Sequence, residues 1–114
     1  PATWPGRPPP IMASADEATW QAQLNEREWF KNCGRAECEE LLQPQPFGTF
    51  LVRPTSRTGA ALCLSHRDED HIGHALIFVQ EQQWMLESVE EKFPDLVSLL
   101  LSLPLDHGPL GVED

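Results

Sequence analysis

The sequence predicts an α+β fold, with one central antiparallel β-sheet and an α-helix on each face. Apolar residues recur at helical spacing in two segments, 35–43 and 93–101, and the chain between them carries the two-residue period of β-strands. The length of 114 residues is enough for one domain with a single modest core. We therefore expect helix, three or more antiparallel strands, and helix, in that order.

The first 19 residues are rich in proline and show no apolar periodicity, which predicts a disordered or extended tail or linker over residues 1–19. The run at 7–10 is an incomplete polyproline ligand motif, and a linker is the simpler interpretation. The folded domain is expected over residues 20–105. Residues 106–114 then form an acidic C-terminal tail.

The two helices of the fold are expected over 35–43 and 93–101. Prolines follow the first helix and end it, and Pro94 suits the first turn of the second. Trp20 and Leu24 lie on one face of a helical segment that precedes both. The apolar stripe of helix 35–43 consists of Cys38, Leu41 and Leu42.

The strands are expected over 49–53, 60–66, 73–79 and 84–86. In the first of them Phe50 and Val52 point to one face, while Leu51 and Arg53 point to the other. An arginine that ends an apolar strand is costly to bury unless an anion meets it, and its guanidinium group can bind a phosphate or carboxylate bidentately. The alternative is that the strand simply reaches the surface there, with Arg53 in solvent.

The net charge of −10 argues against nucleic acids and anionic membranes as partners. The charge is unevenly distributed along the chain. Residues 31–67 hold five basic and three acidic residues, whereas residues 81–114 hold one basic and eight acidic residues. The chain therefore has a mildly basic half and a strongly acidic half.

No apolar run reaches the roughly 20 residues that a membrane span needs, and no signal peptide is recognisable. The cysteines are odd in number and lack the CxxC spacing of metal or redox sites, so we expect reduced thiols in a cytoplasmic or nuclear protein, and we adopt a cytoplasmic location. They are Cys33, Cys38 and Cys63.

Several separate motifs, in the right order from about residue 29 to residue 103, resemble those of a Src homology 2 (SH2) domain. The most specific is Gly48–Arg53, which reads GTFLVR, letter for letter the motif of that family. The others are Trp29-Phe30, Arg35 with Ala36-Glu37 and Glu40-Leu41-Leu42, Leu62–Ser65, His74, and Phe93 with Leu96–Leu99.

The resemblance implies a module that binds phosphotyrosine peptides. By position, Arg53 takes the phosphate bidentately, Arg35 reaches it from the first helix, and His74 borders the aromatic ring. Cys63 either lines the phosphate site or is a small buried apolar residue. The loop that closes over the phosphate consists of Thr55, Ser56, Arg57 and Thr58.

The sequence departs from the family pattern on the strand that carries His74. Leu76 stands where many members have a basic residue, and Ala75 where an aromatic residue is common. We expect Ala75 to leave an apolar groove toward helix 93–101, lined by Trp84, Val89 and the leucines of that helix, and we count Leu76 among the residues that set peptide specificity. Together with the acidic second half of the chain, this predicts a preference for apolar residues a few places after the phosphotyrosine, with neutral or basic neighbours.

A domain of the same fold that packs against proteins without phosphate is the alternative function, and Leu76 and the net charge are compatible with it. No motif supports an enzyme, and no cofactor is expected. Four residues could be drawn as a metal site, but a solvated charged loop beside a site histidine is the simpler interpretation, and no metal is expected. They are Asp68, Asp70, His71 and His74. The expected partner is a tyrosine-phosphorylated peptide or protein.

Overall fold

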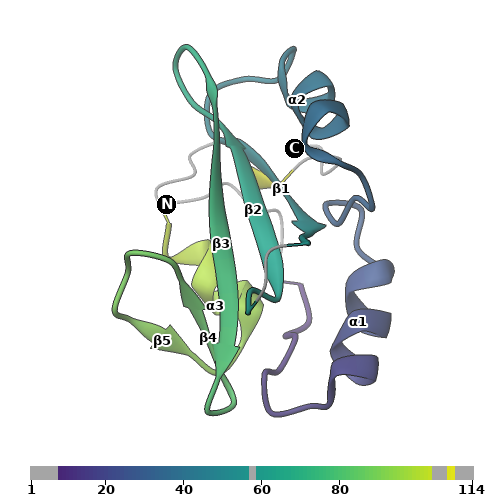
Figure 1. Ribbon diagram of the computed structural model, residues 1–114, viewed down its shortest axis with the longest axis vertical. Helices are drawn as coiled ribbons and strands as arrows, with labels where there is room; N and C mark the ends of the chain where they lie inside the picture. The colour runs from purple at the N-terminus through teal and green to yellow at the C-terminus, as the bar shows by residue number, and fades with distance from the viewer. Residues whose placement is uncertain (1–7, 57–58, 104–107, 110–114) are drawn as a thin grey trace.

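The computed structural model describes residues 8–56, 59–103 and 108–109. Within them, one sheet with the strand order β5-β4-β3-β2-β1-β6 forms the centre of the molecule (Figure 1). The elements in chain order are α1 (Glu17–Asn25), α2 (Arg35–Leu42), β1 (Thr49–Pro54), β2 (Leu62–Arg67), β3 (Ile72–Gln80), β4 (Gln83–Leu86), β5 (Lys92–Phe93), α3 (Leu96–Leu101) and β6 (Gly108–Pro109).

The strands from β1 to β5 pair antiparallel, and helices cover both faces of the sheet, which confirms the predicted fold class. The short strand β6 pairs parallel to β1, so the sheet is mixed at this edge. Because β6 lies within 106–114, the segment expected as a tail contributes to the sheet, and the prediction of a free tail from residue 106 needs this correction.

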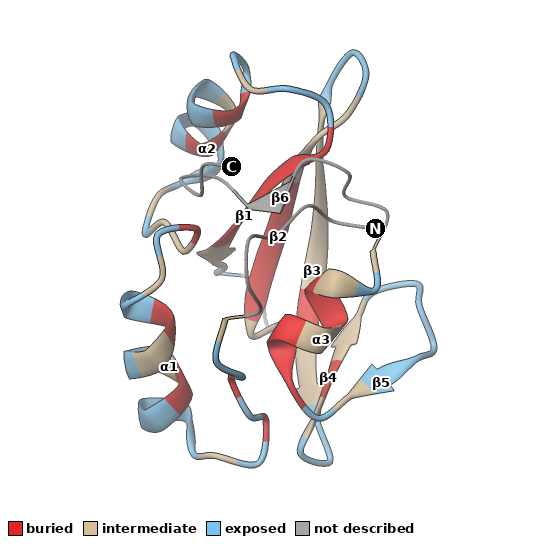
Figure 2. Ribbon diagram, turned by 180° about the vertical axis from the view of Figure 1, so that it is seen from behind, coloured by how far each residue is buried: buried red, intermediate tan, exposed pale blue. Residues whose placement is uncertain are grey.

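The two faces of the sheet bury different amounts of apolar surface (Figure 2). Phe50 and Val52 of β1 face the larger core, with α1 and α3, whereas Leu51 packs against Cys38 and Leu42 of α2. The predicted alternation along β1 is therefore confirmed. The predicted stripe of α2 is correct for two of its three residues. The third, Leu41, is 37% exposed, because it lies one position around the helix from the buried face.

Residues 8–19 differ from the predicted disordered tail. Ile11 is fully buried in the larger core, and its backbone N–H donates to Asp95 Oδ1 at 2.8 Å. The Ile11 carbonyl accepts two hydrogen bonds, from Trp84 Nε1 and from the backbone N–H of Leu96, both at 3.0 Å. Helix α1 then begins at Glu17, where the Asp16 side chain caps the Thr19 N–H. Periodicity does not reveal such docking, because it fixes an irregular segment through single contacts.

The last helix starts later than predicted. Phe93, the first residue of the predicted helix, instead pairs with β4 as part of strand β5, together with Lys92. Asp95 is the N-cap: its carboxylate accepts from the backbone N–H groups of Val97 and Ser98 and from the Ser98 hydroxyl. An aspartate in this position is among the strongest signals for a helix start, and it outweighs the weaker preference of proline for the first turn.

Candidate functional site

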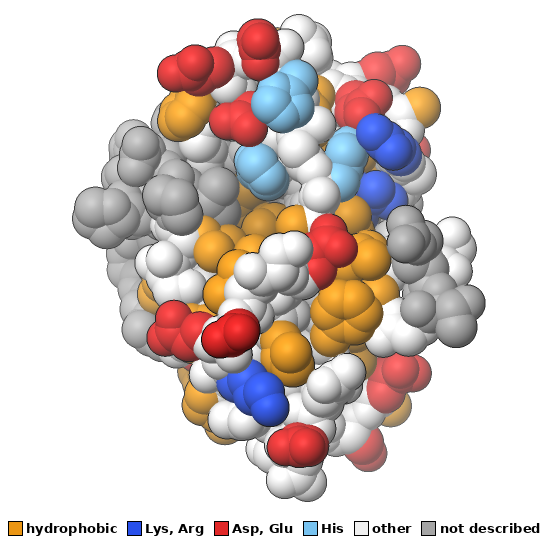
Figure 3. Space-filling model, turned by 60° about the vertical axis from the view of Figure 1, so that its left-hand side comes forward, with side chains coloured by type: hydrophobic (Ala, Val, Ile, Leu, Met, Phe, Trp, Pro, Cys, Tyr) orange, Lys and Arg blue, Asp and Glu red, His pale blue; other side chains and the backbone are white. Residues whose placement is uncertain are grey.

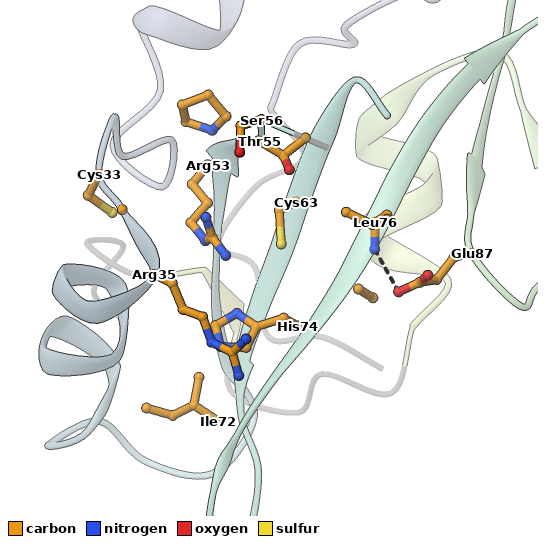
Figure 4. A pocket seen from close by; sticks show the side chains of 13 residues that line it. Cys33, Arg35, Arg53, Thr55, Ser56, Cys63, Ile72, His74, Leu76 and Glu87 are labelled. Carbon is orange, nitrogen blue, oxygen red and sulfur yellow. Dashed lines mark hydrogen bonds between the residues drawn. The ribbon is translucent and has the colours of Figure 1, made fainter. Parts of the chain in front are cut away.

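A cavity of about 810 Å³ opens on the face of the sheet that α2 covers (Figure 4). Charged, polar and apolar side chains line it, from α2, the three central strands and the segment after β1. The lining residues are Cys33, Gly34, Arg35, Arg53, Pro54, Thr55, Ser56, Cys63, Ile72, His74, Ala75, Leu76 and Glu87. Arg35 and Arg53 both point into it, from the helix and from the sheet respectively.

Strand register explains why these side chains meet. Arg53 lies opposite Cys63, and Cys63 lies opposite Leu76, so the three form one row across β1, β2 and β3. Because side chains alternate along each strand, Ser65 and His74 form the adjacent row on the same face. Arg53 and His74 are therefore brought together by the ladder itself rather than by a flexible loop.

A chain of hydrogen bonds links Arg53 to His74 through Ser65. Arg53 Nε donates to Ser65 Oγ at 3.2 Å, and Ser65 Oγ lies 2.9 Å from His74 Nδ1. Since the hydroxyl accepts from Arg53, its own proton is available to Nδ1, and a neutral His74 then carries its proton on Nε2. Ser65 is fully buried, so this chain holds Arg53 and the ring in fixed orientations.

Arg35, the second cation of the site, already contacts a carboxylate, that of Glu39. Glu39 Oε2 lies 3.0 Å from His74 Nε2 and accepts from Arg35 Nε at 3.3 Å. The hydrogen bond with His74, followed by that with Arg35, holds the pKa of the Glu39 carboxyl below its usual value. Glu39 therefore occupies the place where Arg35 and His74 would otherwise meet an incoming anion.

Three cysteines lie in or near the site, and all of them are free. Burial is the main cause that raises the pKa of the Cys33 thiol and of the Cys38 thiol, and the raised values favour a role in packing over nucleophilic chemistry for these two residues. Cys63 is 3% exposed and lines the cavity beside Arg53.

Most of the predicted site residues meet in this cavity: Arg35, Arg53, Thr55, Ser56, Cys63, His74, Ala75 and Leu76. Arg57 and Thr58 lie outside the described residues. Trp84 does not belong to a peptide groove. It is fully buried, and its ring centroid lies 5.2 Å from that of Trp20. Side chains alternate between the two faces of the sheet along β4, and the position of Trp84 faces the larger core.

A second cavity of about 490 Å³ lies beside the β3–β4 hairpin and contains Val89, which is 39% exposed. Its other lining residues are Phe78, Gln80, Met85, Leu86, Glu87, Ser88 and Glu90. The leucines of the last helix were expected to line such a groove, but Leu96, Leu99 and Leu100 are buried in the core on the opposite face. The expected apolar groove therefore has different walls.

Three site residues were missed by sequence reasoning: Ser65, Glu39 and Glu87. Two of them had a signal. Ser65 shares the strand face of Cys63, and Glu39 follows Arg35 by four residues, the spacing of side-chain pairs on a helix surface. Glu87 had none, because it follows the end of β4 and reaches the cavity through the path of the backbone.

The candidate metal residues do not converge. His71 contacts Asp70 at 2.9 Å and Asp68 at 3.4 Å on an exposed loop, whereas His74 bonds to Ser65 and Glu39 in the cavity. Among the described residues, no group of three or more His, Cys, Asp or Glu side chains is arranged to hold a metal ion. The described helices are all too short or too polar to cross a bilayer.

The sheet with helices on both faces, and the cavity lined by Arg35 and Arg53, form the arrangement expected for an SH2 domain. A family model described as SH2 domain matches residues 29–102, and the chain belongs to this family, as its motifs indicated. Domains of this family are generally phosphotyrosine-binding modules in signalling, and they act as binding modules rather than enzymes.

Solved structures agree with this assignment. One is the solution structure of the SH2 domain of the human proto-oncogene protein VAV1, with a TM-score of 0.64 and 22% sequence identity. The match covers 80% of this chain and 75% of the other. At this identity the likeness establishes the fold alone. No curated protein sequence matches the chain.

Proposed function

We propose that this domain binds tyrosine-phosphorylated peptides, with the phosphate held bidentately by Arg53 and contacted by Arg35. The observation that carries the proposal is that both arginines line one cavity, from β1 and from α2. A phosphotyrosine brings about −1.5 to −2 charges and three acceptor oxygens, which suit two guanidinium groups and nearby hydroxyl donors. Thr55 and Ser56 line the same cavity and supply hydroxyls.

The remaining residues of the cavity fit the aromatic part of the ligand. His74, with 14% of its side chain exposed, is held in place by Ser65 and Glu39, and Cys63, Ile72 and Ala75 give apolar walls. A ring that enters with its phosphate toward Arg53 would pass these walls. We place the module in the cytoplasm, as an adaptor in tyrosine-kinase signalling, and the free cysteines are compatible with that compartment.

The test is calorimetric titration of the domain, first with a degenerate mixture of phosphotyrosine peptides and then with the same mixture without phosphate. We expect saturable binding of the phosphorylated form and at least a hundredfold weaker binding of its twin, because the two cations would be left without their anion.

One observation favours phosphate-independent packing as a second candidate function. Glu39 already provides Arg35 and His74 with a carboxylate partner, so the site is partly satisfied without a ligand. Equal affinity for phosphorylated and unphosphorylated peptides would support that function instead.

Arg35 should matter more here than in a domain that has a cation at the position of Leu76. We expect Arg35→Ala to weaken phosphopeptide binding about tenfold, the loss of roughly one charge-assisted hydrogen bond. Leu76 lines the same cavity and lies in the row of Arg53, so a lysine there reaches toward the phosphate. Leu76→Lys should therefore recover part of the loss in the double mutant. No recovery would mean that positions 35 and 76 do not serve one anion.

Glu39 should compete with the phosphate for Arg35 and His74. We expect Glu39→Gln to tighten phosphopeptide binding by about two- to fivefold, the range of an exposed charge pair, with a smaller gain in high salt. Glu40→Gln is the matched control, since Glu40 is exposed on the same helix and carries the same charge. Weaker binding by the Glu39 variant would show that the carboxylate orients Arg35 and His74 rather than competing with the ligand.

A further inference from the structure

The two cavities share one wall, and that wall is Glu87. It lines the larger cavity with Leu76 and Ala75, and it lines the smaller one with Val89 and Phe78. Figure 3 shows a face of the molecule on which histidine side chains gather toward the top and hydrophobic side chains gather over the middle, with acidic side chains at several places among and around them. A ligand chain that occupies both cavities must therefore pass Glu87.

The carboxylate is fixed over the backbone of β3. Glu87 Oε1 accepts from the Leu76 N–H at 3.0 Å, and the Glu87 N–H donates to the Leu76 carbonyl at 2.9 Å (Figure 4). These bonds lie just beyond the last β3–β4 pair, Ile77 with Leu86, and continue the ladder by one position. The side chain is held in place although the residue is exposed.

The Glu87 carboxylate can accept more hydrogen bonds than the one from the Leu76 N–H. An ionised carboxylate has about four acceptor sites, and the Leu76 N–H uses one of them. A lysine or arginine side chain that lies over Glu87 can supply further donors and the opposite charge. A glutamate or aspartate in the same place would bring two like charges together, and binding would remove water from both.

We propose that Glu87 selects the ligand sequence, and that it favours a basic side chain in the segment between the phosphotyrosine and an apolar residue held in the second cavity. This inference rests on the proposed function, since the phosphotyrosine sets the register of the peptide. It assigns to Glu87 the discrimination between basic and acidic ligand residues, which the acidic half of the chain would otherwise exert only through its summed charge.

Two properties of the chain allow a controlled test. Glu87→Gln removes the charge but keeps an amide oxygen that can accept from Leu76, so the fold should be retained. Glu91→Gln is the matched control, because Glu91 is exposed, carries the same charge and lines neither cavity. The two variants therefore have the same net charge, and only Glu87→Gln neutralises a cavity wall.

The probes are three phosphotyrosine peptides that differ in the first two residues after the phosphotyrosine, which are lysine, glutamine or glutamate, followed by a leucine. Each is titrated into the original domain and both variants, together with its unphosphorylated twin. We expect the original domain and the Glu91 variant to bind the lysine peptide about five- to tenfold more tightly than the glutamate peptide. In the Glu87 variant this ratio should fall to about twofold or less.

Each outcome decides the inference. An equal fall of the ratio in both variants would assign the selection to the summed charge of the surface, and an unchanged ratio in the Glu87 variant would exclude that residue. Both results leave the proposed function intact, provided that every domain still prefers the phosphorylated twins. Loss of that preference in the original domain would instead overturn the proposed function, and this inference with it.

Discussion

Arg53→Ala should abolish measurable phosphopeptide binding while the domain stays folded. Truncating one partner of a hydrogen-bonded charge pair in a partly desolvated site costs about 2–5 kcal/mol, which corresponds to a loss of roughly thirtyfold or more. Arg53 is half-buried at the end of β1, and its Nε–H bond to Ser65 aligns the guanidinium group with the cavity. Calorimetric titration of the variant measures the loss.

Two further variants serve as comparisons for the Arg53→Ala result. Arg53→Lys keeps the charge but not the planar fork of donors, and we expect an intermediate affinity. Arg27→Ala is the control, because Arg27 contacts the Gln23 carbonyl on α1 and takes no part in lining the cavity. An affinity of the Arg53→Ala variant within about threefold of the original would be incompatible with bidentate phosphate binding at this position.

Asp95→Ala should cause a large loss of stability although the residue lies outside the site. Asp95 is 5% exposed, caps α3 and accepts from the Ile11 N–H, so it joins the N-terminal segment to the last helix. Loss of a helix cap together with a buried donor left without its partner corresponds to about 2–4 kcal/mol. Denaturant unfolding followed by fluorescence of the buried tryptophans measures the change.

The same residue predicts a pH dependence. Burial alone would raise the pKa of Asp95, but the hydrogen bonds from Ile11, Ser98 and Val97 outweigh it and hold the pKa below its usual value. A carboxyl group whose pKa is lowered on folding stabilises the fold above its unfolded pKa, and this contribution is lost as the pH falls through the folded pKa. Stability of the original domain should therefore decline in acid more steeply than that of the variant.

Asp16→Ala provides the comparison, because Asp16 is also an N-cap aspartate but is exposed and bonds only locally, to Thr19. We expect a smaller loss than for Asp95. Equal losses in the two variants would mean that the Ile11 contact contributes nothing and that residues 8–16 are not part of the folding unit.

The sheet and the site face were predictable because β1 and β2 carry their information locally. The alternation of Phe50 and Val52 with Leu51 and Arg53 determines which side chains face α2. The same period places Cys63 and Ser65 together on β2. The register between strands then follows from burial, since a slip by one residue would turn the apolar residues to the wrong face.

The contacts of residues 8–19 could not be predicted in the same way. Ile11 is held by Asp95 and Trp84, which lie 84 and 73 residues further along the chain. A single apolar residue after a proline run gives no period, so nothing local distinguishes docking from disorder. Trp84 was placed in the ligand groove for a related reason: in a four-residue strand, alternation alone leaves open which face is buried.

The charged contacts of the site could be predicted only in part. The i, i+4 spacing of Arg35 and Glu39 is visible in the sequence, but their contact with His74 depends on how α2 is placed over the sheet. Glu87 reaches both cavities because the chain leaves β4 beside Leu76. Glu39 and Glu87 become neighbours of the site only through tertiary packing. They are the residues that we propose to decide the competition for the anion and the choice of ligand.

The most direct test of phosphate recognition in this cavity is nuclear magnetic resonance of the domain with ¹⁵N-labelled arginine side chains, titrated with a phosphotyrosine peptide. We predict that the Nε–H signals of Arg53 and Arg35 shift together with the ³¹P signal of the peptide, and that all three saturate at one peptide per domain. The signal of Arg27, which follows α1, should stay in place. Saturable peptide binding with unchanged Arg53 and Arg35 signals would contradict the account.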